Sequence, residues 1–171
     1  IRVQSYMKEP IERILAAHAE IAGFANKAIV REFIPGDKWG YCWSRHPDDQ
    51  FYIESFPLSH NPQSAGIGVM DLNRNPIVAT VFDTDYRGLE MNSELLMKYP
   101  TVICECTMMG PSDICTKHHH LNLHEVVDFF GRSKTLRKLI LMNFSYRYTP
   151  DEIRMKVALS GMSDKIIPVL E

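Results

Sequence analysis

Residues 138–148, KLILMNFSYRY, combine a short apolar run with a polar cluster that follows it directly. A run of this length and composition is typical of a buried strand. The Asn, Ser, Arg and Tyr after it stand where that strand would end. Upstream, Asp83 and Glu105 also lie at the ends of apolar segments, and His120 precedes an amphipathic one. We therefore expect a strand that delivers polar groups to a functional site.

The predicted secondary structure changes in kind along the chain. The first part is predicted to be antiparallel, whereas the second alternates strands and helices, which suits a sheet covered by helices on one face. Asn92, Asn122 and Thr149 precede helical patterns and are expected to cap them. The predicted strands span residues 1–4, 26–34, 51–58, 64–72, 77–83, 101–105 and 138–144. The predicted helices span residues 9–22, 92–99, 122–133 and 150–161. We expect a single α/β domain over residues 1–171.

The composition is that of a globular protein. The 171 residues are 45% hydrophobic and 23% charged, which excludes a disordered chain. A formal net charge of −2 excludes a protein that coats nucleic acid by bulk positive charge, because phosphate neutralisation needs clustered Lys and Arg. Residues 132–138 contain a cluster of basic residues, which could be either a local anion-binding patch or a solvated surface.

Cysteine content and hydropathy bear on the compartment. The four cysteines form no spaced disulfide framework in a chain of this size, so a reducing, intracellular compartment (cytoplasm or organelle matrix) is expected. Cys104 and Cys106 are expected to be buried free thiols; a thiolate zinc site that includes Cys115 is the alternative. No apolar run approaches the roughly 20 residues that cross a bilayer. The chain begins with Ile1 rather than Met, so we expect upstream sequence in the natural protein.

Five segments between residues 51 and 148 occur in an order that gives the chain a family resemblance. They are LSH at 58–60, FDT at 82–84, CECT at 104–107, His120 followed by LNLHEVV, and LMNFSYRY at 141–148. In this order they resemble the tRNase Z (ribonuclease Z) branch of the metallo-β-lactamase superfamily. There, an apolar strand ends in a ligand histidine, and G-D-T, H-E-A-T, H-S-T and L-T-H-x-S-x-R-Y elements follow. The resemblance implies an αββα sandwich, of which this chain is the later part.

The resemblance also implies two zinc ions, with manganese as an alternative metal. His60 would bind one ion and Asp83 would bridge both, since a hard carboxylate suits a bridging position. Two departures stand against a complete site. The family's main metal loop, H-x-H-x-D-H, is absent, and Asn143 replaces the ligand histidine of the closing motif; an amide oxygen is a poorer zinc ligand than imidazole. Whether Asn143 is natural or engineered stays open.

Glu105 and His120 would form the catalytic pair that the resemblance implies. In the family the glutamate orients a histidine that donates a proton to the leaving oxygen. A carboxylate bonded to imidazole raises its basicity and fixes its tautomer, which suits acid–base work near neutrality. Within the HHH run, His120 is chosen because Glu125 follows it at the spacing of the family's H-S-T-x-x-E helix start. The other two histidines, His118 and His119, are expected to be exposed and solvated.

Ser145, Arg147 and Tyr148 complete the S-x-R-Y signature and would bind phosphate. The guanidinium group of arginine supplies a planar fork that matches phosphate oxygens, and hydroxyl groups add neutral donors. The expected partner is therefore RNA or a nucleotide phosphodiester; a homodimer or a larger assembly stays open. The chain has no Gly-Pro-rich basic insertion like the long arm of tRNA-specific members. The resemblance thus extends to phosphodiester chemistry rather than to transfer RNA in particular.

Several of these residues also have a purely structural interpretation. His60 could be a loop histidine with ordinary hydrogen bonds, and Asp83 could simply begin a turn at the end of its strand. Arg147 could pair with a nearby carboxylate, either Asp151 or Glu152. These alternatives stay open at the level of the sequence.

The leading hypothesis is the later portion of a tRNase Z-like, metal-dependent phosphodiesterase or endoribonuclease that acts on RNA 3′ ends. It would be an enzyme as part of a complete domain that supplies the missing metal loop. Two alternatives stay open. A catalytically degenerate relative would serve as a binding or structural subunit of a larger, RNA-containing assembly, as Asn143 favours. A cyclic-nucleotide phosphodiesterase would explain the absent arm and the acidic balance.

Overall fold

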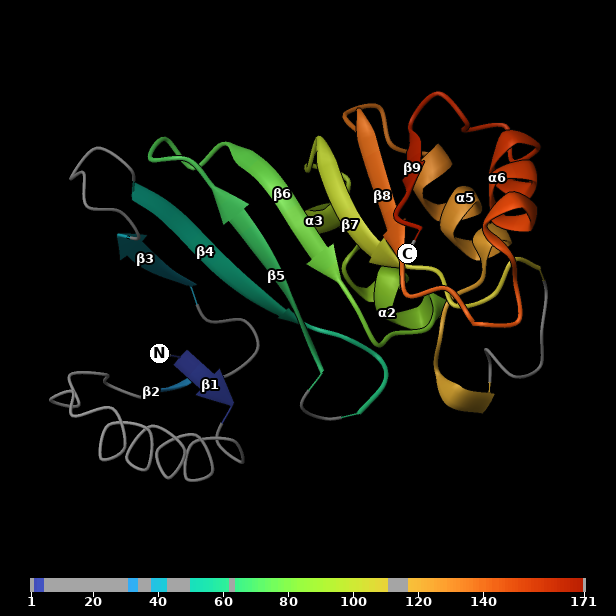
Figure 1. Ribbon diagram of the computed structural model, residues 1–171. Coiled ribbons are helices and arrows are strands. Elements are labelled where there is room, and N and C mark those ends of the chain that lie inside the picture. Colours follow the sequence, from blue (N-terminus) through green and yellow to red (C-terminus); the bar gives the residue numbers. More distant parts are fainter. Residues whose placement is uncertain are drawn as a thin grey trace, which may run out of the picture.

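The computed structural model describes residues 2–4, 31–33, 38–42, 50–61, 64–110 and 117–170, with side chains from residue 52 onward. Its main element is a seven-stranded sheet with the strand order β3-β4-β5-β6-β7-β8-β9 (Figure 1). These strands are β3 (Lys38–Cys42), β4 (Gln50–Pro57), β5 (Ala65–Met70), β6 (Pro76–Val81), β7 (Thr101–Glu105), β8 (Lys138–Met142) and β9 (Ile166–Pro168). Two further strands, β1 (Arg2–Gln4) and β2 (Arg31–Phe33), form a separate parallel pair. The predicted helix at 9–22 lies outside the described residues.

The sheet is antiparallel in its first part and parallel in its second. Strands β3 to β6 pair as antiparallel neighbours, and β6 to β9 pair as parallel ones. The β5–β6 hairpin is closed by the Asp71 carboxylate, which accepts hydrogen bonds from the backbone N–H and the side-chain amide of Asn75 at 2.7 and 2.8 Å. The predicted change from hairpins to alternating strands and helices is therefore confirmed.

Helices connect the parallel strands and lie on one face of the sheet (Figure 1). They are α2 (Tyr86–Met91), α3 (Ser93–Leu96), α5 (Leu123–Gly131) and α6 (Pro150–Ala158). Successive parallel strands step across the sheet in one direction, so right-handed crossovers place every connecting helix on the same side. Because these strands are parallel, their carboxyl ends lie at the same edge of the sheet. Strands β6, β7 and β8 each lead into a loop there before the next helix begins.

The predicted caps are confirmed for two helices and wrong for one. Asn122 and Thr149 each form a capping box, with the glutamate three residues further along. Asn92 makes no side-chain cap to α3. Its amide instead donates to the carbonyl oxygens of Pro57 and Gly88, at 2.7 and 2.8 Å. Asn92 does not cap α3 because it ends helix α2, which was not predicted. Its side-chain amide is used instead to bond α2, at Gly88, to the end of β4, at Pro57.

The core lies between the sheet and the helix layer. Val102, Leu139 and Leu141 on the two central parallel strands are fully buried, as are Phe129 and Phe130 on α5. Burying each such side chain stabilises the fold by roughly 1.5–3 kcal/mol. Two cysteines, Cys104 and Cys106, are buried in this core as predicted, and they form no disulfide among the described residues; Cys115 lies outside the described residues. The core holds the strands rigidly, and with them the residues at their carboxyl ends.

The opposite face of the sheet has no covering helix among the described residues (Figure 1). Ile67 on β5 and Ile167 on β9 alternate with buried neighbours and are 38% and 47% exposed. The αββα resemblance predicts a second sheet on this face. The prediction that residues 1–171 form a single domain stays a prediction. Within the described ranges, no helix is long and apolar enough to span a membrane.

Candidate active site

Three of the predicted site residues meet at the carboxyl edge of the parallel strands. Asp83 follows β6, Glu105 ends β7, and Asn143 follows β8 directly. The register aligns these ends, because Val81 faces Cys104 and Glu105 faces Met142 in the parallel ladders. Ligands of open α/β sheets bind at this edge. The fold therefore collects polar side chains from three separate segments at one place.

Glu105 and His120 form a direct pair at this edge. Glu105 is fully buried, and its Oε2 lies 2.8 Å from Nδ1 of His120, whose side chain is 25% exposed. Two other donors fix the carboxylate: the Thr84 backbone N–H donates to Oε1 at 2.7 Å, and the Thr107 hydroxyl donates to Oε2 at 2.8 Å. A carboxylate acceptor at Nδ1 selects the tautomer that is protonated there and leaves Nε2 available. The structure thus brings the two residues together; their catalytic role stays a prediction.

The pKa of Glu105 is raised above its ordinary value. Burial is the main cause, because a desolvated carboxylate is costly to ionise. The hydrogen bonds from Thr84, Thr107 and His120 oppose this effect and lower the pKa without cancelling the effect of burial. Carboxyl groups with shifted pKa values are common at functional sites. The Glu105–His120 pair is therefore the strongest indication of a functional site at this edge of the sheet.

The loop that carries His120 is held by the backbone around it. The Leu123 N–H donates to the carbonyl oxygen of Met108 at 2.8 Å, and Met108 forms an isolated parallel bridge with Asn122. Asn122 also caps α5 and exchanges hydrogen bonds with Glu125. These contacts start two residues after His120, so they restrict where its ring can lie. Glu125, which helped to identify His120 in the sequence, has a structural role as the helix cap.

Asp83 stands beside the pair and is exposed to solvent. It adopts a left-handed backbone conformation with φ of 51°, which turns the chain sharply after β6 and which Asp tolerates better than most residues. One donor atom from each of Asp83, Glu105 and His120 lies within 4.8 Å of the others. A set of carboxylate oxygens with an imidazole nitrogen fits a divalent cation such as zinc or manganese. Asp83 is the member whose oxygens are open to such an ion.

Two further histidines surround His120. The His60 ring centroid lies 5.2 Å from that of His120, and its Nδ1 donates to the carbonyl oxygen of His119 at 3.3 Å. His118 is exposed as expected. His119 is also exposed as expected, but it is not free of contacts, because its Nδ1 donates to Oδ2 of Asp85 at 2.7 Å.

The His119–Asp85 pair went unpredicted. Partial burial raises the pKa of Asp85, but hydrogen bonds from His119 and from the backbone of Gly88 outweigh this effect and hold the pKa below its ordinary value. The only sequence signal for the pair was the second aspartate of FDTD, which also caps α2 by accepting from Gly88. The pair ties the histidine loop to the start of α2, next to the predicted site.

The closing segment lies alongside these residues. Asn143 is exposed and left-handed, with φ of 63°. Ser145 is fixed by its backbone N–H, which donates to the carbonyl oxygen of Thr107 at 2.9 Å. Tyr148 is half-buried and packs against the core. The structure therefore places the start of the S-x-R-Y segment, at Ser145, next to the Glu105 loop.

Arg147 is exposed, and its guanidinium group forms no ion pair with the described residues. The proposed structural partners are engaged elsewhere: Asp151 pairs with Arg154 at 2.7 Å, and Glu152 accepts from Thr149. The alternative of a pairing with Asp151 or Glu152 is therefore wrong in this structure. The guanidinium group stays available for an anion.

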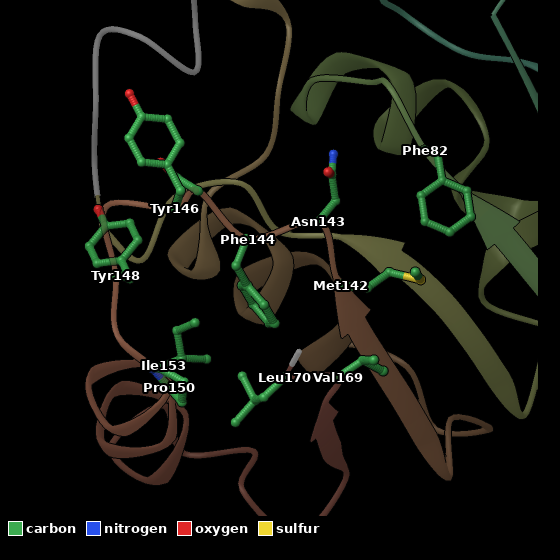
Figure 2. Close-up of a pocket in the computed structure, with 11 residues that line it drawn as sticks. Phe82, Met142, Asn143, Phe144, Tyr146, Tyr148, Pro150, Ile153, Val169 and Leu170 are labelled. Carbon is green, nitrogen blue, oxygen red and sulfur yellow. The ribbon is translucent and has the colours of Figure 1, made fainter.

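A pocket of about 580 Å³ opens beside Asn143 (Figure 2). Phe82 closes it on the side of β6, and the side chains of Phe144, Tyr146 and Tyr148 contribute aromatic rings. The sequence did not predict this pocket, because its walls come from four places: the residue after β6, the end of β8 with the segment that follows it, α6, and the segment after β9.

The comparisons with known proteins rest on structure rather than sequence. No protein-family model matches the chain, and no curated protein matches it significantly by sequence. The metallo-β-lactamase fold protein YhfI from Bacillus subtilis matches with a TM-score of 0.62 at 16% identity, over 90% of this chain and 58% of its own. A diphosphatase from the PhnP family matches with a TM-score of 0.59 at 11% identity, over 99% and 55%. The short form of human tRNase Z matches with a TM-score of 0.53 at 18% identity, over 80% and 58%.

These likenesses show the fold. The chain spans between 55% and 58% of the length of each of these structures, which agrees with the prediction of a partial sandwich. The predicted fold class is confirmed, and a tRNase Z is among the proteins that share it. The chain thus has the metallo-β-lactamase fold.

Proposed function

We propose that this chain is part of a metal-dependent phosphodiester hydrolase of the tRNase Z kind. The observation that carries the proposal is the buried Glu105 carboxylate bonded to Nδ1 of His120, beside the exposed carboxylate of Asp83. A buried carboxylate that is hydrogen-bonded to a partly exposed imidazole is typical of a general acid or base held in position. Further support comes from the fold shared with a tRNase Z and with a diphosphatase.

His120 would act as the general acid. The bond from Nδ1 to Glu105 keeps a proton on that nitrogen, so a second proton on Nε2 can pass to the leaving oxygen of the phosphodiester. Glu105 stabilises the doubly protonated ring by its charge and fixes its direction. Proton transfer from a positioned side chain typically contributes about 10²- to 10⁴-fold to the rate.

Asp83 would hold a divalent metal, with His60 from the neighbouring loop as a further ligand. The chemistry that a cation held there would supply is the activation of a water molecule and the stabilisation of charge on phosphorus. Zinc or manganese fits these donors. The remaining ligands would come from the H-x-H-x-D-H loop that we expect upstream. Residues 1–171 would then form the later portion of one domain.

Phosphate positioning would fall to the closing segment. The guanidinium group of Arg147 is exposed and without an ion pair among the described residues, and it can bind two phosphate oxygens at once. Ser145 is tied to Thr107, the residue that also donates to Glu105. In this proposal the segment would hold a phosphate near His120. RNA 3′ ends are the substrate that the family resemblance favours.

The test is hydrolysis by the natural full-length protein with added zinc or manganese. Bis(p-nitrophenyl) phosphate, a 3′-extended RNA and 3′,5′-cyclic AMP serve as substrates, so that the endoribonuclease and the cyclic-nucleotide enzyme give different results. His120→Ala should lower kcat by about 10²-fold or more. His124→Ala, which removes an exposed histidine of α5, is the matched control. Equal rates for the two variants would refute the assignment.

A non-catalytic subunit is the second candidate, and Asn143 favours it. This residue stands exposed where the family places a ligand histidine, and its amide is a weak zinc donor. Elemental analysis of the full-length protein and of its Asn143→His variant separates the two candidates. Bound metal in the natural protein supports the hydrolase. No metal in either form, together with no hydrolysis, supports the subunit.

A further inference from the structure

We propose that the pocket beside Asn143 binds a nucleobase, that of the nucleotide adjoining the scissile phosphate. This inference rests on the proposed function for the position of the phosphate, but the pocket itself is defined by the structure alone. Its volume of about 580 Å³ lies in the range typical of small-molecule sites.

The pocket is joined to the Glu105–His120 pair through Thr107. The Thr107 hydroxyl donates to Glu105 at 2.8 Å, and its carbonyl oxygen accepts from the backbone N–H of Ser145 at 2.9 Å. Ser145 lines the pocket. A base in the pocket and a phosphate at His120 would therefore belong to neighbouring parts of one nucleotide.

The lining matches the chemistry of a base. Among the described residues, those that line the pocket carry no charge, so the pocket suits a neutral group, whereas Arg147 stands outside it for the phosphate. Aromatic rings from Phe144, Tyr146 and Tyr148 offer flat surfaces on which any base can stack. The combination of rings with polar tips favours a planar heterocycle over a lipid chain.

Asn143 and Tyr146 are exposed members of the lining. Tyr146 is 94% exposed, and its ring extends to the open side of the pocket, whereas Phe144 points toward the apolar wall (Figure 2). The Asn143 side chain stands at the rim between Phe82 and Tyr146 (Figure 2). A carboxamide offers one acceptor and two donors, which can pair with the edge of adenine in two hydrogen bonds. Asn143 would thus read a base instead of binding a metal.

The test compares two ligands that differ only in the base. Binding of AMP and of ribose 5-phosphate to the natural full-length protein is measured by isothermal titration calorimetry. We expect AMP to bind about tenfold more tightly, in line with the stacking of one base on an aromatic side chain. Tyr146→Ala should remove most of that preference, and Tyr146→Phe should keep it. Leu159→Ala, at another exposed position (80%) at the carboxyl end of α6 that does not line this pocket, is the control for a nonspecific loss.

The outcomes separate this inference from the proposed function. Equal binding of AMP and ribose 5-phosphate would overturn the base pocket, whether or not phosphodiesters are hydrolysed. A Tyr146-dependent preference for AMP in a protein that hydrolyses no phosphodiester would keep the pocket and reject the hydrolase. Competition by a short oligoribonucleotide and by 3′,5′-cyclic AMP then shows whether the base belongs to RNA or to a small nucleotide.

Discussion

Replacing Glu105 tests whether this residue anchors the site or merely fills space. Its carboxylate accepts from the Thr84 backbone N–H at 2.7 Å, from the Thr107 hydroxyl at 2.8 Å and from Nδ1 of His120 at 2.8 Å. Thr84 is fully buried, so its N–H cannot turn to water if the acceptor is lost. The hydroxyl group and the imidazole ring are partly exposed and can find water.

The magnitude follows from these contacts. In Glu105→Ala the buried N–H of Thr84 loses its acceptor, which costs about 1–3 kcal/mol, and the missing methylene costs about 0.8 kcal/mol more. Relief of the buried carboxylate, whose pKa is raised mainly by burial, offsets part of this cost. We expect a net loss of about 2 kcal/mol in the free energy of unfolding.

Glu105→Gln should separate stability from chemistry. The amide oxygen can still accept from Thr84, so the free energy of unfolding should fall by only about 1 kcal/mol. The amide NH₂, however, would face Nδ1 of His120 as a donor, and the ring would answer by moving its proton to Nε2. The rate should then fall by about 10²-fold, because the acid has lost both its orientation and its compensating charge.

Two measurements on the natural full-length protein check this reasoning. Urea unfolding followed by circular dichroism gives the stability of both variants, and ¹⁵N chemical shifts of labelled histidine report which ring nitrogen of His120 carries the proton. The reasoning fails if Glu105→Ala unfolds with unchanged stability. It also fails if Glu105→Gln leaves the proton on Nδ1.

Three further predictions concern other parts of the fold. Asn122→Ala removes the cap of α5 and should lower the unfolding free energy by about 1–2 kcal/mol, with altered NMR signals at the His120 ring. Gly68→Ala places a methyl group against the buried hydroxyl of Tyr99 and should cost about 1–3 kcal/mol in urea unfolding. Glu152 has a lowered pKa because the Thr149 backbone N–H and hydroxyl donate to it. Its stabilisation should be present above the ordinary value of 4.5 and lost as the pH falls through the lowered value; thermal unfolding of Glu152→Gln should lack this pH dependence.

The elements that could be predicted from the sequence are those whose signals are local. Strand β8 and helices α5 and α6 have their apolar patterns and caps within their own segments. Helix α2 has no such pattern; it depends on the Asp85 cap and on the edge-to-face contact of Tyr86 with Phe129 on α5. Strand β9 consists of three residues, and it becomes a strand because Ile166 pairs with Leu139 of β8. Tertiary contacts therefore determine both helix α2 and strand β9.

The site divides in the same way. Asp83 and Glu105 could be predicted because each follows or ends an apolar run. The choice of His120 needed the family motif, since three adjacent histidines offer no periodicity. The Asp85–His119 pair could not be predicted, because it joins residues 34 positions apart and depends on the left-handed turn at His119, with φ of 55°. The pocket likewise needs four segments to be assembled.

At position 143, a histidine would provide both a left-handed backbone turn and a metal-binding nitrogen, whereas Asn143 provides only the turn. The chain turns left-handed at this position, with φ of 63°, and Asn, Asp and His are the non-glycine residues that accept such a turn most readily. Asn143 therefore allows the turn that precedes Ser145 and Arg147, but it lacks the imidazole nitrogen. The presence of the S-x-R-Y segment thus does not by itself indicate catalysis. Glu105 is different, because its carboxyl group is fully buried at the end of β7, and this burial raises its pKa and makes its ionisation costly. This buried carboxyl group, bonded to His120, is the stronger argument for chemistry at this edge.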